Sequence, residues 1–155
     1  MPQAAPRIAE AGPADRDDWL ELRTLLWPGS PDDHPGEMEA IRVSDDLLCV
    51  IARGADERAV GFAEAAIRRD YVNGCDTSPV GFLEGIFVRP EARRLGVARA
   101  LVAAAADWVR SKGCSEFASD AEIDNLDSHN MHSALGFVET QRVVYFRQRL
   151  IPTGH

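Results

Sequence analysis

The sequence predicts a single mixed α/β domain of the α+β type, in which helices flank a mostly antiparallel sheet. The chain has 155 residues, of which 45% are hydrophobic, and this is enough for one sizeable core. Short apolar runs of strand length are interspersed with longer segments whose apolar residues recur at helical spacing. One strand also leads through a turn into a long helix, which indicates a crossover connection. We therefore expect one domain over residues 1–155.

The N-terminal third predicts a short strand, Arg7 to Ala11, followed by an amphipathic helix, Asp15 to Trp27. Residues 32–46 predict a second, shorter helix with Pro35 near its start. This second segment holds one arginine and six carboxylates: Asp32, Asp33, Glu37, Glu39, Asp45 and Asp46. Its acidic face is either a solvated surface or the wall of a site for cations.

The central part of the chain predicts three strands. Leu47 to Ala52 and Val60 to Ile67 are apolar runs with turn residues at 54–56 between them, so we expect an antiparallel hairpin. A polar loop, Arg69 to Pro79, comes next. The β-branched and aromatic run Val80 to Val88 then predicts a third strand.

The C-terminal part contains the clearest helix of the chain, Leu95 to Lys112, with one apolar face and a glycine stop at Gly113. Glu116 to Ser119 has the length of a short strand. Asn125 to Leu135 predicts a further helix. Phe137 to Leu150 predicts a final strand or a pair of strands.

Composition narrows the function classes. The formal net charge of −8 repels phosphate backbones, so we expect no nucleic-acid partner and favour a cationic small molecule. No apolar run is long enough for a membrane span and the start lacks a leader pattern, which predicts a cytoplasmic protein without membrane attachment. Cys49, Cys75 and Cys114 lack paired spacing, so we expect reduced packing thiols and no metal site.

The turn between the strand ending at Val88 and the long helix reads Arg93-Arg94-Leu95-Gly96-Val97-Ala98. A helix N-terminus offers unpaired N–H groups and a partial positive charge, so such a turn can seat an anion. Gly96 and Ala98 allow a ligand to approach the backbone, and the arginines add the charge that a diphosphate requires. The competing interpretation of Gly96 is a cap or a packing contact.

This turn resembles the R/Q-x-x-G-x-G/A signature of the GNAT superfamily of N-acetyltransferases, and Asn125 to Phe137 resembles the family's N-x-x-A/S-x-x-L/F-Y-x-x-x-G-F helix. The resemblance implies a GNAT fold and acetyl-CoA as co-substrate. It assigns coenzyme binding to Asn125, to the pantetheine-binding strand Ile86, Phe87 and Val88, and to the pyrophosphate turn Arg93, Arg94, Leu95, Gly96, Val97, Ala98 and Arg99.

One position departs from the family pattern. His132 stands where most of the superfamily has tyrosine, the usual proton donor to the leaving thiolate. Histidine can also donate a proton, so His132 is either that acid or a packing and hydrogen-bonded residue.

Several other runs resemble one branch of the superfamily, the aminoglycoside 6'-N-acetyltransferases: L-W-P-G-S-P-D-D at 26–33, R-R-D-Y-V-N-G-C-D at 68–76, F-L-E-G-I-F-V at 82–88 and A-S-D at 118–120. The resemblance implies acetylation of the 6'-amine of aminoglycosides and, with it, antibiotic resistance. By position it assigns sugar-ring contacts to Trp27 and Tyr71 and ammonium contacts to Glu84 and Asp120. Gln141 falls where relatives often carry a carboxylate. The competing interpretations are a core residue at Trp27, a loop anchor at Tyr71 and a helix cap at Asp120.

Acetyl transfer to an ammonium group requires a base, a donor for the oxyanion and a neutralised thiolate. Glu84 is the candidate base, directly or through water, and the N–H near Val88 is the candidate oxyanion donor. Two alternatives keep the fold: acetylation of another amine, such as a polyamine, an amino acid or a protein N-terminus, and a non-catalytic acetyl-CoA-binding module. Because relatives are commonly dimers and the apolar run Val143 to Phe146 could pair across subunits, we expect a homodimer.

Overall fold

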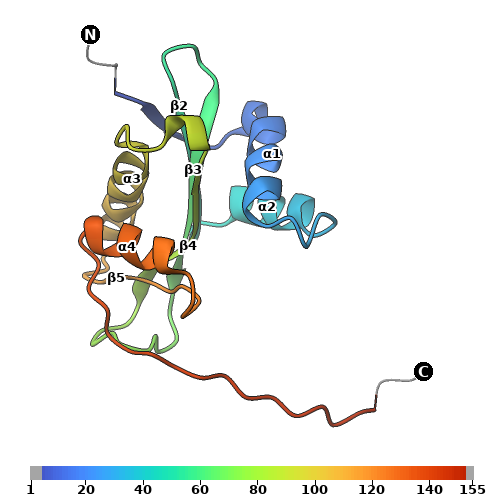
Figure 1. Ribbon diagram of the computed structural model, residues 1–155, viewed down its shortest axis with the longest axis vertical. Helices are drawn as coiled ribbons and strands as arrows, with labels where there is room; N and C mark the ends of the chain where they lie inside the picture. The colour runs from blue at the N-terminus through green and yellow to red at the C-terminus, as the bar shows by residue number, and fades with distance from the viewer. Residues whose placement is uncertain (1–4, 153–155) are drawn as a thin grey trace.

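The computed structural model describes residues 5–152 and contains one sheet with helices on both faces (Figure 1). The strands are β1 (Arg7–Glu10), β2 (Leu47–Arg53), β3 (Ala59–Arg68), β4 (Val80–Val88) and β5 (Phe117–Ser119). The helices are α1 (Arg16–Leu26), α2 (His34–Val43), α3 (Val97–Ser111) and α4 (Leu126–Ala134), and two short 3₁₀ turns are η1 (Pro13–Asp15) and η2 (Pro90–Ala92).

The five strands lie in sequence order, β1-β2-β3-β4-β5. The first three pairings are antiparallel, and the last, between β4 and β5, is parallel. A parallel pair needs a long connection, which here runs through η2 and α3. The mixed α/β class and the mostly antiparallel sheet predicted from the sequence are therefore confirmed.

The two faces of the sheet carry separate apolar clusters, with α1 and α2 on one side and α3 on the other (Figure 1). The apolar run of strand β2 contributes to both clusters, because successive side chains of a strand point to opposite faces of the sheet. Leu48 and Val50 join the cluster under α3, whereas Cys49 and Ile51 join Trp19 under α1. A strand covered on both faces is apolar at every position, which explains the continuous runs in the sequence.

The predicted elements up to residue 135 are confirmed, with ends that differ by at most three residues. The three cysteines are free, and Cys49 and Cys114 are buried. Burial raises the pKa of the Cys49 thiol well above its ordinary value, as expected of a packing residue. No helix within residues 5–152 is long and apolar enough to cross a membrane. The same residues hold no group of three or more metal-ligating side chains.

The predicted final strand or strand pair over Phe137 to Leu150 is wrong for this chain. These residues form an extended arm that leaves the domain after α4, and within the described residues no strand pairs with it (Figure 1). The run is apolar enough for a strand, but a strand requires a hydrogen-bonded neighbour. Val144, Tyr145 and Phe146 are instead 76%, 84% and 92% exposed.

Candidate active site

A β-bulge marks the middle of β4. In the register with β3, Glu64 lies opposite Gly85 and Ala65 opposite Leu83, so Glu84 is an extra residue on β4. Bulges bend a strand and redirect a side chain, and they are frequent beside active sites. The bulge therefore places the carboxylate predicted as the base at the point where β4 changes direction.

Strands β4 and β5 part at the same point. They pair only over Gly81 to Leu83 on β4, and the last pair joins Leu83 to Ser119. The next residues along the two parallel strands are Glu84 and Asp120. Neighbouring strands lie about 5 Å apart, so this register brings the two predicted ammonium contacts to one place. Beyond it, the edge of β4 that faces away from β3 has no strand beside it in the described residues.

The backbone of Val88 faces that free edge. The N–H of Arg89 donates to the carbonyl of Val60 on β3 at 2.8 Å, and successive residues of an antiparallel strand direct their backbone groups to opposite edges. The N–H and C=O of Val88 therefore point away from β3. In agreement, Nε of Arg93 donates to the carbonyl of Val88 at 3.0 Å. The N–H predicted as oxyanion donor thus lies on the edge predicted for the pantetheine arm.

The turn before α3 has the backbone of an anion seat. Arg94 and Gly96 have φ angles of 65° and 80°, both left-handed, and Gly96 is the N-cap of α3. Alternating conformations of this kind turn successive N–H groups toward one spot, where the helix dipole also favours negative charge. Two arginines predicted to bind the diphosphate have other contacts: Arg93 donates to the carbonyl of Val88 on β4, and Arg99 donates to the carbonyl of Ala134 at 2.9 Å. The predicted contribution of this turn thus rests mainly on its backbone.

The structure gives Asn125 and His132 definite local contacts. Oδ1 of Asn125 caps α4 by accepting from the N–H of Ser128 at 3.1 Å. Nδ1 of His132 lies 2.7 Å from the carbonyl of Ser128, which can only accept, so Nδ1 carries the proton. Nε2 lies 2.7 Å from Oγ of Ser119. His132 is thus hydrogen-bonded at both ring nitrogens, as its packing interpretation requires.

Trp27 is half-buried against the strand that carries Glu84. A side chain at Gly85 would overlap the indole ring of Trp27, so this glycine admits the ring to the sheet. On the sheet, Phe62 meets the same ring edge to face at a centroid distance of 6.1 Å. Trp27 therefore stands beside the bulge, partly in the core and partly available to a ligand.

A buried ionic cluster under Trp27 was not predicted from the sequence. Nη1 of Arg23 donates to both carboxylate oxygens of Glu64, at 2.8 and 2.7 Å, and Nε donates to Nδ1 of His34 at 3.1 Å. Arg23 also lies over the indole of Trp27, 4.9 Å from its centroid, and pairs with Glu37. Burial raises the pKa of Glu64, while the Arg23 guanidinium opposes that rise.

Two sequence signals could have revealed this cluster. Glu64 is the one charged residue in the apolar run 60–67, and a carboxylate in a strand buried on both faces needs a partner. Arg23 lies four residues from both Trp19 and Trp27, on the apolar side of α1, and Trp19 itself donates its indole N–H to Glu64 at 2.8 Å.

The remaining predicted substrate contacts lie on surface connections rather than on strands. Tyr71 is 70% exposed in the loop between β3 and β4. Gln141 is exposed on the C-terminal arm, where its neighbour Thr140 lies against Gly74 of that same loop. The carboxylate of Glu116 fixes the loop by accepting from the N–H groups of Asp76 and Thr77, at 3.0 and 2.7 Å from Oε1.

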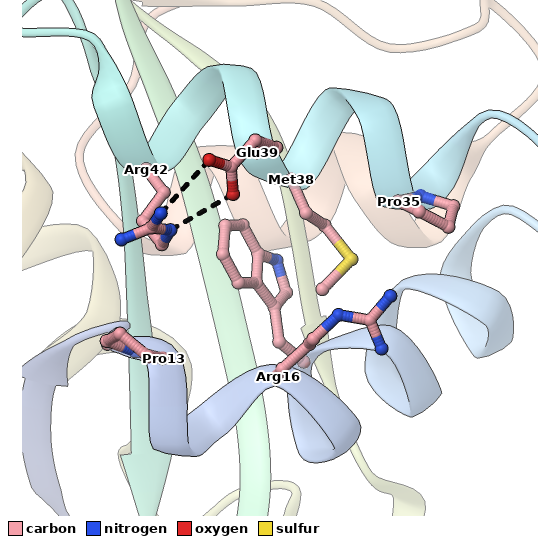
Figure 2. Close-up of a pocket in the computed structure, with 8 residues that line it drawn as sticks. Pro13, Arg16, Pro35, Met38, Glu39 and Arg42 are labelled. Carbon is pink, nitrogen blue, oxygen red and sulfur yellow. Dashed lines mark hydrogen bonds and ion pairs between the residues drawn. The ribbon is translucent and has the colours of Figure 1, made fainter.

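A separate hollow of about 270 Å³ lies between the start of α1 and α2 (Figure 2). Trp19 and Met38 form its apolar part, and Arg42 pairs with Glu39 beside it. Its lining contains none of the residues predicted for catalysis or binding. Trp19 and Met38 of this hollow also belong to the apolar cluster that Trp27 packs against.

Comparison with known proteins decides the family. Residues 17–137, most of the chain, match the acetyltransferase (GNAT) family. This chain belongs to that family. The GNAT fold predicted from the turn and from the Asn125 segment is thereby confirmed.

Relatives within the GNAT family are similar over nearly the whole length. An aminoglycoside N(6')-acetyltransferase type 1 of Serratia marcescens is 55% identical over 135 residues, 86% of this chain and 92% of that protein. One from Stenotrophomonas maltophilia is 46% identical over 154 residues, 99% of this chain and 100% of that protein. The structure of AAC(6')-Iy with the bisubstrate analogue CoA-S-monomethyl-acetylneamine has a TM-score of 0.90 and 50% identity, covering 94% of this chain and 99% of that chain.

Proposed function

We propose that this GNAT protein is an aminoglycoside 6'-N-acetyltransferase, which transfers the acetyl group of acetyl-CoA to the 6'-amine of an aminoglycoside and so confers resistance. The observation that carries the proposal is the pair of carboxylates, Glu84 and Asp120, at the point where β4 and β5 part, beside the ring of Trp27. Relatives up to 55% identical bear the corresponding name. A polycationic substrate matches both the carboxylates and the net charge of −8.

The free edge of β4 and the turn before α3 fit acetyl-CoA. By the alternation that turns Val88 away from β3, the backbone groups of Ile86 also face the free edge and are available to an amide-containing arm, whereas those of Phe87 face β3. The left-handed turn at Arg94 and Gly96 offers N–H groups to a diphosphate. The bound coenzyme supplies an acetyl group activated as a thioester.

The protein's own groups then account for proton movement. Glu84 accepts the proton of the substrate ammonium, directly or through water, because the nitrogen needs a free lone pair to attack. The N–H of Val88 donates to the carbonyl oxygen as negative charge develops on it. The departing thiolate takes its proton from water, or from Nε2 of His132 when His132 is an imidazolium, which leaves the neutral imidazole hydrogen-bonded to Oγ of Ser119.

Substrate selection falls to side chains around the two carboxylates. Trp27 gives a rigid apolar wall to a sugar ring, and Tyr71 supplies a second ring from the loop between β3 and β4. Asp120 holds an ammonium group. Gln141, being neutral, contributes a hydrogen bond without the charge that a carboxylate would add.

Steady-state thiol release tests the function. Wild-type protein is assayed with a 2-deoxystreptamine aminoglycoside bearing a 6'-amine and with one bearing a 6'-hydroxyl, and we expect turnover only on the amine. Equal turnover on both acceptors would contradict 6'-selectivity. Turnover on a polyamine or peptide but on no aminoglycoside would favour another amine acetyltransferase, and coenzyme binding without any turnover would favour a non-catalytic module.

The assembly we propose is a homodimer joined through the C-terminal arm, in a reducing cytoplasm that supplies acetyl-CoA. The support is the exposed apolar run Val143 to Phe146, which is long enough to pair with a strand edge, and three unpaired cysteines. Sedimentation analysis should give a dimer, and replacing Val144 and Phe146 with lysine should give a monomer. A wild-type monomer would contradict this assembly.

A further inference from the structure

The proposed base does not stand free, because Arg68 already holds it. Arg68 is the last residue of β3, and its guanidinium donates hydrogen bonds to both carboxylate oxygens of Glu84. Nη2 donates to Oε1 and Oε2 at 2.9 Å each, and Nε donates to Oε1 at 3.1 Å. Among residues 5–152, Glu84 is the only carboxylate within ion-pair distance of Arg68.

A second contact fixes where Arg68 lies. Its guanidinium carbon stands 3.5 Å from the ring centroid of Phe82, a buried residue two positions before Glu84 on the same strand, β4. The pair is open to water, since the side chains of Arg68 and Glu84 are 42% and 35% exposed. The stacking on Phe82 does not involve Glu84, so Arg68 keeps one partner when its hydrogen bonds to Glu84 are replaced.

A substrate ammonium needs the same oxygens. A carboxylate offers about four lone-pair sites, and three are directed to Arg68 in the free protein. A base must also be within hydrogen-bond distance of the proton that it accepts. With about one site left over, the substrate and Arg68 compete for Glu84 in this geometry.

We infer that Arg68 is a resident counter-cation, which the ammonium group of the substrate displaces from Glu84. The inference rests on the proposed function and identifies Arg68 as a residue that sets selectivity. A single amine gains little by replacing a bidentate guanidinium, whereas a polycation gains because its other ammonium groups are held at the same time, for example by Asp120. Arg68 thereby disfavours small monoamines, which are abundant competitors for an exposed carboxylate.

The test replaces Arg68 with glutamine and measures KM, kcat and calorimetric affinity for a 2-deoxystreptamine aminoglycoside with a 6'-amine. Removing an exposed ion pair that competes with the substrate should lower KM and Kd by about three- to tenfold. Arg68→Lys restores a cation and should return both values toward wild type. A simple primary amine should gain as acceptor, so discrimination against it should fall in Arg68→Gln.

Arg69→Gln is the matched control. Arg69 is the next residue and is also exposed, and it pairs with Asp46 at 3.0 Å instead of with Glu84. Arg69→Gln removes the same charge from the same end of β3, so its long-range electrostatic effect on the substrate equals that of Arg68→Gln. Because Arg69 does not contact Glu84, this variant should alter KM by less than about twofold. Thermal unfolding of both variants checks that each is folded.

The outcomes separate the inference from the proposed function. Wild type that neither binds nor acetylates any aminoglycoside would overturn both. Active wild type with an unchanged or higher KM in Arg68→Gln, or with equal effects of Arg68→Gln and Arg69→Gln, would overturn the counter-cation alone. A large loss of kcat at constant KM would also overturn it, because Arg68 would then be holding Glu84 in its working position.

Discussion

Replacing Arg23 with methionine would leave the buried Glu64 carboxylate without its guanidinium while keeping a side chain of similar length. Arg23 and Glu64 are 2% and 4% exposed, and within residues 5–152 Arg23 is the only cation paired with Glu64. Breaking a buried pair on one side typically costs ~3–5 kcal/mol, because the remaining charge keeps its desolvation penalty. Trp19 would still donate one hydrogen bond to Glu64, so we expect a loss near the lower end of that range.

Urea denaturation measures the loss. For a domain of this size an m-value of roughly 2 kcal/mol/M converts ~3 kcal/mol into a midpoint lower by roughly 1.5 M. Arg42→Met is the control, because Arg42 pairs with Glu39 on the surface, with side chains 42% and 60% exposed. Such pairs contribute ~0.2–1 kcal/mol. Equal losses in Arg23→Met and Arg42→Met would refute the conclusion that Glu64 is a charged and desolvated partner.

The pH dependence of the Arg23→Met variant has a definite sign. Burial already raises the pKa of Glu64, and removing the opposing guanidinium raises it further. A group whose pKa is higher in the folded state than in the unfolded state favours folding below the unfolded pKa, and this contribution is lost as pH rises through the folded pKa. The deficit of Arg23→Met should therefore be smaller near pH 5 than near pH 8. The double variant Arg23→Met, Glu64→Leu should recover most of it and lose the pH dependence.

Three further predictions concern the site. Gly96→Val should weaken coenzyme A binding by roughly 30-fold in calorimetry, because valine strains the φ angle of 80° that the turn uses; unchanged affinity in a folded variant would remove the turn from the coenzyme site. Asp120→Asn should raise the aminoglycoside KM at a cost of ~1.5–3 kcal/mol, whereas Glu84→Gln should lower kcat and be partly rescued at high pH. Both variants should keep nearly normal affinity for acetyl-CoA. If the two variants change KM and kcat in the same way, their separate roles are contradicted. His132→Phe should reduce turnover about tenfold or less, since an ordinary thiol, which ionises near about pH 8.5, can take its proton from water, and a thousandfold loss would make His132 the essential acid.

Local patterns in the sequence were sufficient to predict the helices and strands whose side chains are buried against other parts of the same chain. The strand Val80–Val88 was predicted to the residue, because an apolar run bounded by turn residues has one interpretation when both faces are covered. Phe137 to Leu150 also contains β-branched and aromatic residues, yet it lies extended without a partner among the described residues. Composition indicates that a segment can form a strand, but pairing depends on what lies beside it in space.

The sequence marks Glu64 and Arg23 as charged residues in apolar surroundings, but it does not identify which charged residues pair, for a related reason. Arg23 and Glu64 are 41 residues apart, and Arg68 and Glu84 are 16 apart and on different strands, so no single helix or strand contains either pair. The second pair also contains the bulged residue, Glu84. Because of this extra residue, Leu83 and Gly85 oppose consecutive residues of β3 and so face opposite sides of the sheet, a break in alternation that composition does not indicate.

The buried cluster and the candidate active site share one cross-strand pair. Glu64 on β3 lies opposite Gly85 on β4, and the missing side chain of Gly85 admits Trp27, which Arg23 covers from the other side. The contacts form a closed ring through Glu64, Gly85, Trp27 and Arg23. The residue that anchors the buried charge therefore also fixes the distance between the aromatic wall and the bulge at Glu84. Because a packed core deforms little, this ring holds Trp27 rigidly beside the two carboxylates of the proposed substrate site, whereas the proposed contacts Tyr71 and Gln141 lie on a surface loop and on the arm.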